Sequence, residues 1–192
     1  MPKHSPESNK RPIRTYLGDL AWEKVRKENG LPELSAQSKA NLAEANRLLE
    51  THSLVIYANH PGNDVGIAVA LAMSGLSNAK RFLAPAGMRH YDLGRDLVSG
   101  ILLRALRILT IHMIPVVQKS DLESYSQTKR EQLILNLKAR TERLFAKQGS
   151  VYGITPEGTR SGETGEIRQA NTGIAQLEKY APKDNPLVYL PV

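Results

Sequence analysis

The chain has 192 residues, a formal net charge of +7 and no cysteine. This length suits one domain with a hydrophobic core, and the lack of cysteine excludes a disulfide framework, a thiol nucleophile and a thiolate metal site. A basic balance favours nucleic acid, anionic lipid headgroups, acidic carriers or phosphorylated substrates as partners. Because the sequence carries no helix-turn-helix, RNA-binding or zinc-finger signature, we rank lipid and phosphate above nucleic acid.

Residues 1–14 are polar, basic and rich in proline, and no apolar stretch follows them as in a secretory signal. They predict a disordered arm ahead of a single domain over residues 15–192. Weak attraction of this arm to an anionic membrane is the alternative to a simply solvated tail.

Two helices are predicted next, separated by a break at residues 30–32. Residues 16–28 predict a short helix, with Leu17, Leu20, Trp22 and Val25 as its apolar contacts. Ser35 predicts the N-cap of a second helix that runs to about residue 50. The buried stripe predicted for that helix is Ala36, Leu42, Ala45, Leu48 and Leu49.

The rest of the chain alternates predicted strands with predicted helices. The strands are residues 53–58, 81–86, 111–117, 151–154 and 187–192, and the helices are residues 65–74, 92–109, 122–148 and 171–180. This order implies parallel βαβ units. The predicted fold class is therefore α/β, with a mixed, largely parallel sheet flanked by helices. The long helix should bury Leu133, Leu137, Leu144 and Phe145, with Gly149 as its C-cap.

Residues 92–109 are apolar but carry Arg95, Arg104 and Arg107, so they are too polar to span a bilayer. Two interpretations stay open for them. One is a core helix with exposed arginines, and the other is an interfacial helix that lies on a membrane.

The strand at 151–154 runs into a rigid polar turn, residues 155–161. This turn offers a carboxylate from Glu157, a guanidinium from Arg160, hydroxyls and backbone N–H groups. Such a loop suits a phosphate or another anion, because arginine binds it as a fork and N–H groups complete the cradle. A surface turn in which Glu157 and Arg160 pair with each other is the alternative.

A second polar turn follows the strand at 53–58. His60 lies just past that strand and Asp64 follows four residues later, which suggests a base and the acid that orients it. If Pro61 opens a helix, one turn brings Asp64 beneath His60. Ordinary turn and cap residues are the alternative.

Together these stretches resemble the glycerolipid acyltransferase family, the PlsC-like group that includes 1-acylglycerol-3-phosphate acyltransferases. Residues 154–161 (Ile-Thr-Pro-Glu-Gly-Thr-Arg-Ser) look like the family's Phe-Pro-Glu-Gly-Thr-Arg-Ser block, and residues 59–64 look like its Asn-His-x-x-x-x-Asp block. Residues 114–119 sit where the family has a strand ending in arginine, and residues 188–192 resemble its last block. The four blocks occur in family order and cover roughly residues 50–192.

The sequence departs from the family pattern at three places. Three residues separate His60 from Asp64, where the family has four. Lys119 replaces an arginine, which exchanges a planar fork for a point charge, and Thr155 replaces a phenylalanine. The chain also ends within the last predicted strand, so a C-terminally truncated or divergent member of the glycerol-3-phosphate acyltransferase-like fold is expected, with a short natural terminus as the alternative.

The resemblance implies an O-acyltransferase of phospholipid biosynthesis, cytoplasmic and peripheral at a membrane. It would move a fatty acyl group from acyl-CoA or acyl carrier protein to the hydroxyl of a lysophosphatidate or related glycerol-phosphate acceptor. His60 would be the general base and Asp64 its orienting acid. The acceptor would be bound by Glu157, Gly158, Thr159, Arg160 and Lys119. No metal and no cofactor besides the thioester co-substrate are implied.

Two other classes of function stay open. One is a catalytically degenerate phospholipid-binding module of the same fold. The other, weaker, is a basic nucleic-acid binder. His52, His90 and His112 are interpreted as ordinary structural or surface residues.

Overall fold

The computed structural model of the chain describes residues 13–28, 30, 32–57, 75–87, 111–117, 119–154 and 174–191. Its helices are α1 (Ile13–Glu28), α2 (Ala36–Leu48) and α5 (Gln127–Phe145), with 3-10 helices η3 (Lys119–Ser124) and η4 (Ile174–Tyr180). Its strands are β1 (Ser53–Tyr57), β2 (Arg81–Gly87), β3 (Ile111–Val116), β4 (Ser150–Ile154) and β5 (Leu187–Pro191). The predicted α/β class and all five predicted strands are confirmed.

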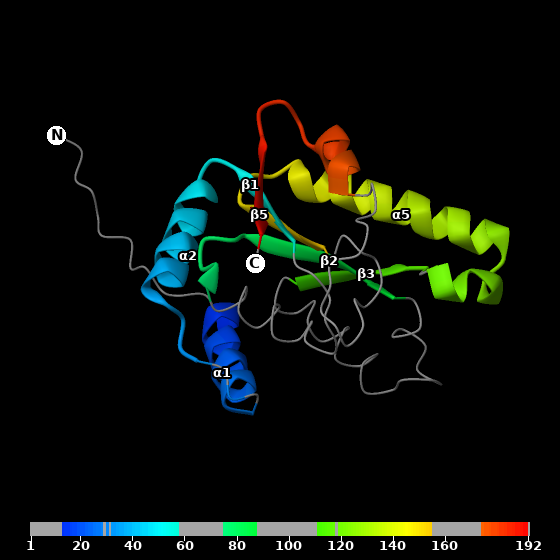
Figure 1. Cartoon of the computed structure of the whole chain (residues 1–192). Helices are drawn as coiled ribbons and strands as arrows, with labels where there is room; N and C mark the ends of the chain where they lie inside the picture. Colours follow the sequence, from blue (N-terminus) through cyan, green and yellow to red (C-terminus); the bar gives the residue numbers. More distant parts are fainter. Residues whose placement is uncertain are drawn as a thin grey trace.

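The strands form one sheet in the order β3-β2-β4-β1-β5 (Figure 1). Every pairing among them is parallel, so a mixed sheet was the wrong expectation for the described strands. Parallel strands need long crossover connections, usually helical, and the spacing of these strands along the chain provides room for them.

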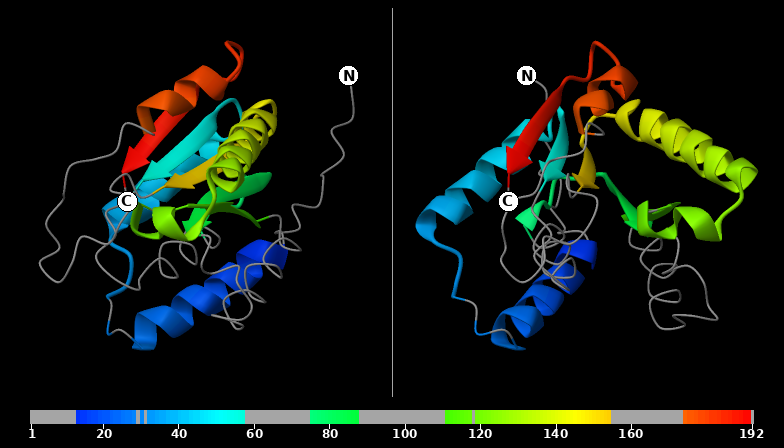
Figure 2. Two further views of the ribbon diagram at one scale, coloured as in Figure 1. Left: turned by 90° about the vertical axis from the view of Figure 1, so that its right-hand side faces the viewer. Right: turned by 45° about the vertical axis from the view of Figure 1, so that its right-hand side comes forward.

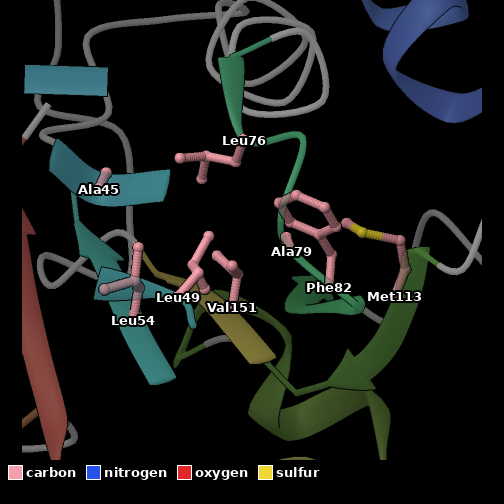
Figure 3. Packing of buried hydrophobic residues seen from close by; sticks show 8 residues of the cluster. All are labelled: Ala45, Leu49, Leu54, Leu76, Ala79, Phe82, Met113 and Val151. Carbon is pink, nitrogen blue, oxygen red and sulfur yellow. The ribbon is translucent and has the colours of Figure 1, made fainter. Parts of the chain in front are cut away.

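Alternate residues of each strand enter two separate cores. Leu54 faces the side of the sheet that α2 covers, while its neighbour Val55 faces the side covered by α5 and η4. Figure 2 shows α2 and α5 on opposite sides of the strands. The α2-side core consists of Ala45, Leu49, Leu54, Leu76, Ala79, Phe82, Met113 and Val151 (Figure 3). The α5-side core consists of Val55, Leu83, Ile114, Leu144, Phe145, Tyr152 and Leu177.

Capping side chains set the starts of helices α2 and α5. The Ser35 hydroxyl accepts the Ser38 N–H at 3.0 Å, which confirms the predicted N-cap of α2. The Ser126 hydroxyl accepts the Lys129 N–H at 3.3 Å. Helix α5 therefore begins at Gln127, later than predicted, because η3 occupies the preceding residues. The predicted buried side of α5 is confirmed, with Leu137 half-buried and its partners buried.

The contacts predicted for α1 are partly wrong. The helix itself is confirmed and begins at Ile13, inside the expected arm, but Leu17 and Leu20 are 37% and 54% exposed. Trp22 is half-buried, and the side chain of Val25 lies outside the described set. The remainder of the arm and the helices expected at 65–74 and 92–109 also lie outside the described residues.

Gly149 is not the C-cap of α5, which was another wrong expectation. The cap is Ala146, and Gly149 follows it with φ of 75°, a backbone conformation that favours glycine. Its N–H donates to the carbonyl of His52 at 3.1 Å, and its carbonyl accepts the N–H of Lys80 at 2.7 Å. The glycine thereby joins the chain just before β1, β2 and β4 at the amino-terminal edge of the sheet.

A buried polar cluster closes the same edge. The Asn185 amide donates to the hydroxyl of Ser53 at 3.0 Å and to the carbonyl of Phe145. The Ser150 hydroxyl donates to the carbonyls of Leu144 and Lys147, at 2.8 and 2.6 Å. These bonds tie the end of α5, the starts of β1 and β4 and the turn before β5 into one unit.

We expect Asn185→Ala to lower the free energy of unfolding by roughly 1–3 kcal/mol, because the buried carbonyl of Phe145 loses its donor. The measurement is urea unfolding followed by circular dichroism. Asn41→Ala on α2 is the matched control, since Asn41 is exposed and its exchange should change stability by less than about 0.5 kcal/mol. Equal stability of the two variants would show that the cluster does not stabilise the fold.

Candidate functional site at the carboxyl edge of the sheet

The two strands that precede the polar turns are neighbours at the centre of the sheet. Strand β1 pairs with β4 in parallel, and the last pair of their register is Tyr57 opposite Ile154. His60 follows Tyr57 by three residues, and Glu157 follows Ile154 by three residues. Both turns therefore leave the same edge of the sheet from adjacent strands and from the same level.

The described residues at the far ends of the connections after β1 and β4 lie on opposite faces of the sheet. After β1 the chain returns through Leu76 and Ala79, which lie in the α2-side core. After β4 it returns through Ile174 and Leu177, which pack with the α5-side core. The first connection leads toward the β3 edge and the second leads to β5 at the other edge. In open parallel sheets, a crevice forms at the carboxyl ends of neighbouring strands whose connections run in opposite directions along the sheet. Ligands bind in that crevice.

The strand ends at this edge of the sheet carry no charge. The last residues of the five strands are Tyr57, Gly87, Val116, Ile154 and Pro191. Ionic contacts made next to uncharged, largely apolar side chains are stronger than the same contacts in water. Charge for catalysis or binding must then come from the segments that continue past the strands, which is where both sequence motifs lie.

Six of the seven predicted site residues lie outside the described residues: His60, Asp64, Glu157, Gly158, Thr159 and Arg160. The structure places β1 and β4 side by side, and these strands lead into the two segments that contain the six residues. The predicted pairing of His60 with Asp64, and of either turn with a ligand, stays a prediction.

Lys119 is the seventh predicted residue and the first residue of η3. Its strand, β3, lies at the edge of the sheet, and β2 separates it from β4. With strands about 4.8 Å apart, the end of β3 is offset by about 10 Å from that of β4. Strands β2 and β3 also continue two residues past the level of the Tyr57–Ile154 pair. The segment that begins with Lys119 therefore starts farther from the ends of β1 and β4 than the two motif-bearing segments do.

His52 lies at the opposite edge of the sheet from the proposed crevice. Its ring nitrogen Nδ1 is 2.8 Å from the hydroxyl of Thr51, and its carbonyl accepts the N–H of Gly149. A structural role for His52 agrees with these contacts. His112 lies within β3, while His90 is outside the described residues. Within the described ranges, no three histidine or acidic side chains gather as metal ligands would.

Sequence reasoning missed Tyr189, whose hydroxyl oxygen is buried without a hydrogen-bond partner among the described residues. It lies on β5 opposite Val55, two residues below the last pair of β1 with β5. Burial raises its pKa, and the nearby Glu178 carboxylate adds to the effect. The hydroxyl thus stays protonated at neutral pH. From the sequence, only the alternation of side chains along β5 would have indicated the buried position of Tyr189.

The remaining perturbed tyrosine is structural. Burial raises the pKa of Tyr152 to about 12, and its hydroxyl is hydrogen-bonded to Thr141 of α5. Tyr152 belongs to the α5-side core, where its ring packs against Phe145.

Neither a scan against protein-family models nor a search among curated proteins finds a match for this chain. The described residues also contain no helix with the length and apolarity that crossing a membrane requires.

Convergence of the two turns can be tested because the chain has no cysteine. We expect an Asn59→Cys/Thr159→Cys variant to be joined in high yield by a short bifunctional thiol reagent, since both segments leave neighbouring strand ends. The control, Thr51→Cys/Thr159→Cys, moves one thiol to the amino-terminal edge and should give little product. Proteolysis and mass spectrometry measure both yields, and equal yields would contradict a shared site.

Proposed function

We propose that the chain is an O-acyltransferase that moves a fatty acyl group from a thioester donor to the hydroxyl of a glycerol-phosphate acceptor. The donor would be acyl-CoA or acyl carrier protein, and the acceptor a lysophosphatidate or related lipid. The single observation that carries this proposal is the parallel pairing of β1 with β4. Because three residues extend at most about 11 Å, the segments with His60 and Glu157 start close enough to meet over the crevice.

The residue types on the two segments supply the two halves of the reaction. His60 takes the proton of the acceptor hydroxyl as its oxygen attacks the thioester carbon. The carbon–sulfur bond then breaks, and the imidazolium of His60 returns the proton to the leaving thiolate. Asp64 holds the ring in the correct tautomer and stabilises its charged form. The acceptor itself is the nucleophile, so this route needs no acyl-enzyme.

In this proposal the segment after β4 binds the acceptor. The guanidinium of Arg160 offers a planar fork for the acceptor phosphate, and backbone N–H groups near Gly158 complete the cradle. N–H groups near Gly62 or Gly158 also suit the oxyanion that forms at the thioester carbon. Lys119 adds a second positive charge from the side of β3.

We expect His60→Ala to lower acyl transfer by at least roughly a hundredfold, because general-base catalysis contributes about 10²–10⁴ to a rate. The assay measures thiol release from acyl-CoA with lysophosphatidate, and binding of the acceptor is measured separately. His52→Ala is the matched control, since both histidines flank β1, at opposite edges of the sheet. It should keep nearly full turnover. Unchanged turnover in His60→Ala would remove this residue from the mechanism.

A second candidate function rests on the short spacing between His60 and Asp64, which has three intervening residues. If this spacing keeps the imidazole and the carboxylate apart, the chain is a phospholipid-binding module without catalysis. In that case the wild-type chain binds lysophosphatidate but releases no thiol, and His60→Ala leaves binding unchanged.

We expect Arg160→Lys to raise the KM for the acceptor more than the KM for the thioester, because lysine cannot form the two parallel bonds of the fork. A rise of roughly tenfold corresponds to about 1.4 kcal/mol of lost binding. Arg143→Lys on the exposed surface of α5 is the control and should change neither constant. An equal rise in both KM values for Arg160→Lys would argue against its contact with the phosphate.

A further inference from the structure

Helix α5 exposes two large apolar side chains that are adjacent in the sequence. Ile134 and Leu135 are each 65% exposed, the highest values among the large hydrophobic residues of the described chain. Both lie near the middle of α5, which forms one margin of the molecule in Figure 1. Single exposed leucines are ordinary, but an adjacent apolar pair on an otherwise polar helix surface is a candidate contact site.

Two opposite charges flank this pair at equal spacing. Glu131 lies three residues before Ile134, and Lys138 lies three residues after Leu135. Seven residues make nearly two helical turns, so the two charged side chains project within about 20° of each other, in the direction between the apolar pair. At about 1.5 Å per residue, each charge is about 5 Å along the axis from the midpoint of the pair. All four side chains are exposed.

The pattern is complementary to itself when the helix is reversed. If a second copy of α5 packs antiparallel about a two-fold axis through the midpoint of the apolar pair, Glu131 of each copy comes level with Lys138 of the other. Ile134 of one copy then meets Leu135 of the other. Parallel packing in register would instead place like charges together, so the charges favour the antiparallel orientation.

The residues farther from the axis agree with this register. Gln127 and Glu142 lie on the same exposed side, and the two-fold axis brings the amide of one level with the carboxylate of the other. Lys129 and Arg140 also come level, but they project about 170–190° away from the apolar pair, outside the contact. The only like-charged residues that this register aligns within α5 are therefore kept apart.

The two flanking charges are not paired within the described part of the chain. Glu131 and Lys138 are about 10 Å apart along the axis, too far to pair with each other. Glu131 accepts a hydrogen bond from the amide of Gln127 at 2.9 Å through one carboxylate oxygen, Oε1. No described carboxylate forms an ion pair with Lys138. A second copy would supply an opposite charge to both residues.

We propose that α5 is the contact surface of a symmetric dimer of this chain, in which two copies of the helix pack antiparallel. Four apolar side chains form the centre, and two Glu131–Lys138 pairs flank it. Such a contact is smaller than the roughly 1,200 Å² at which standard interfaces begin, so the two copies should exchange readily. Exposed ion pairs add little affinity, and the charges here mainly fix orientation and register. The contact needs neither His60 nor Arg160 and is independent of acyl transfer.

The first test is analytical ultracentrifugation of the full chain over a concentration series, with circular dichroism to confirm folding. The wild type should show a monomer–dimer equilibrium. Ile134→Ser/Leu135→Ser should raise the dissociation constant by about tenfold or more, since it removes the apolar centre. Leu17→Ser/Leu20→Ser makes the same exchange at exposed leucines of α1 and should stay within about twofold of wild type. A wild type that is monomeric at every concentration, or equal loss in both variants, would overturn the proposal.

The second test reverses the charges. Glu131→Lys and Lys138→Glu should each weaken the dimer by roughly fivefold or more, because each creates two like-charged pairs across the axis. The double exchange Glu131→Lys/Lys138→Glu should restore it, and so should an equimolar mixture of the two single variants. Lys129→Glu changes the net charge as Lys138→Glu does, on the other side of α5, and should stay within about twofold of wild type. Single variants that dimerise like the wild type, or a double exchange that fails to recover, would overturn the antiparallel contact.

Discussion

The parallel pairing of β1 with β4 is the contact on which the rest of the structure depends. Ser53 and Ser150, at the starts of these strands, are 97 residues apart in the sequence. Closing so long a loop costs conformational entropy that the pairing alone does not recover. Burial on both faces offsets this cost: Leu54 and Val151 enter the α2-side core, while Val55 and Tyr152 enter the α5-side core. The same four residues thus hold the two cores together and place two polar turns side by side.

The two edges of the sheet differ in chemistry. At the amino-terminal edge, Asn185, Ser53 and Ser150 form buried hydrogen bonds that hold the ends of several elements. Buried polar groups that find partners add rigidity, although the Oδ1 atom of Asn185 is buried without a hydrogen-bond partner among the described residues. At the carboxyl edge, the five strands end in uncharged residues, and the motif-bearing segments begin there. Stability and proposed chemistry are therefore assigned to opposite ends of the same strands.

The catalytic proposal has two separate supports. The motifs carry the catalytic proposal, and the adjacency of β1 and β4 makes it physically reasonable.

Local features of the sequence determined the elements but not their arrangement. The strands, the Ser35 cap and the buried side of α5 follow from patterns within a few residues, because alternation, periodicity and capping are short-range effects. The motifs after β1 and β4 were also visible, but the roles of His60 and Arg160 remain predictions. Tertiary structure alone decided the order β3-β2-β4-β1-β5, the outward side of α1 and the polar cluster around Asn185. Each of these depends on partners far away in the chain, and a local pattern contains no information about which distant strand or helix will cover it.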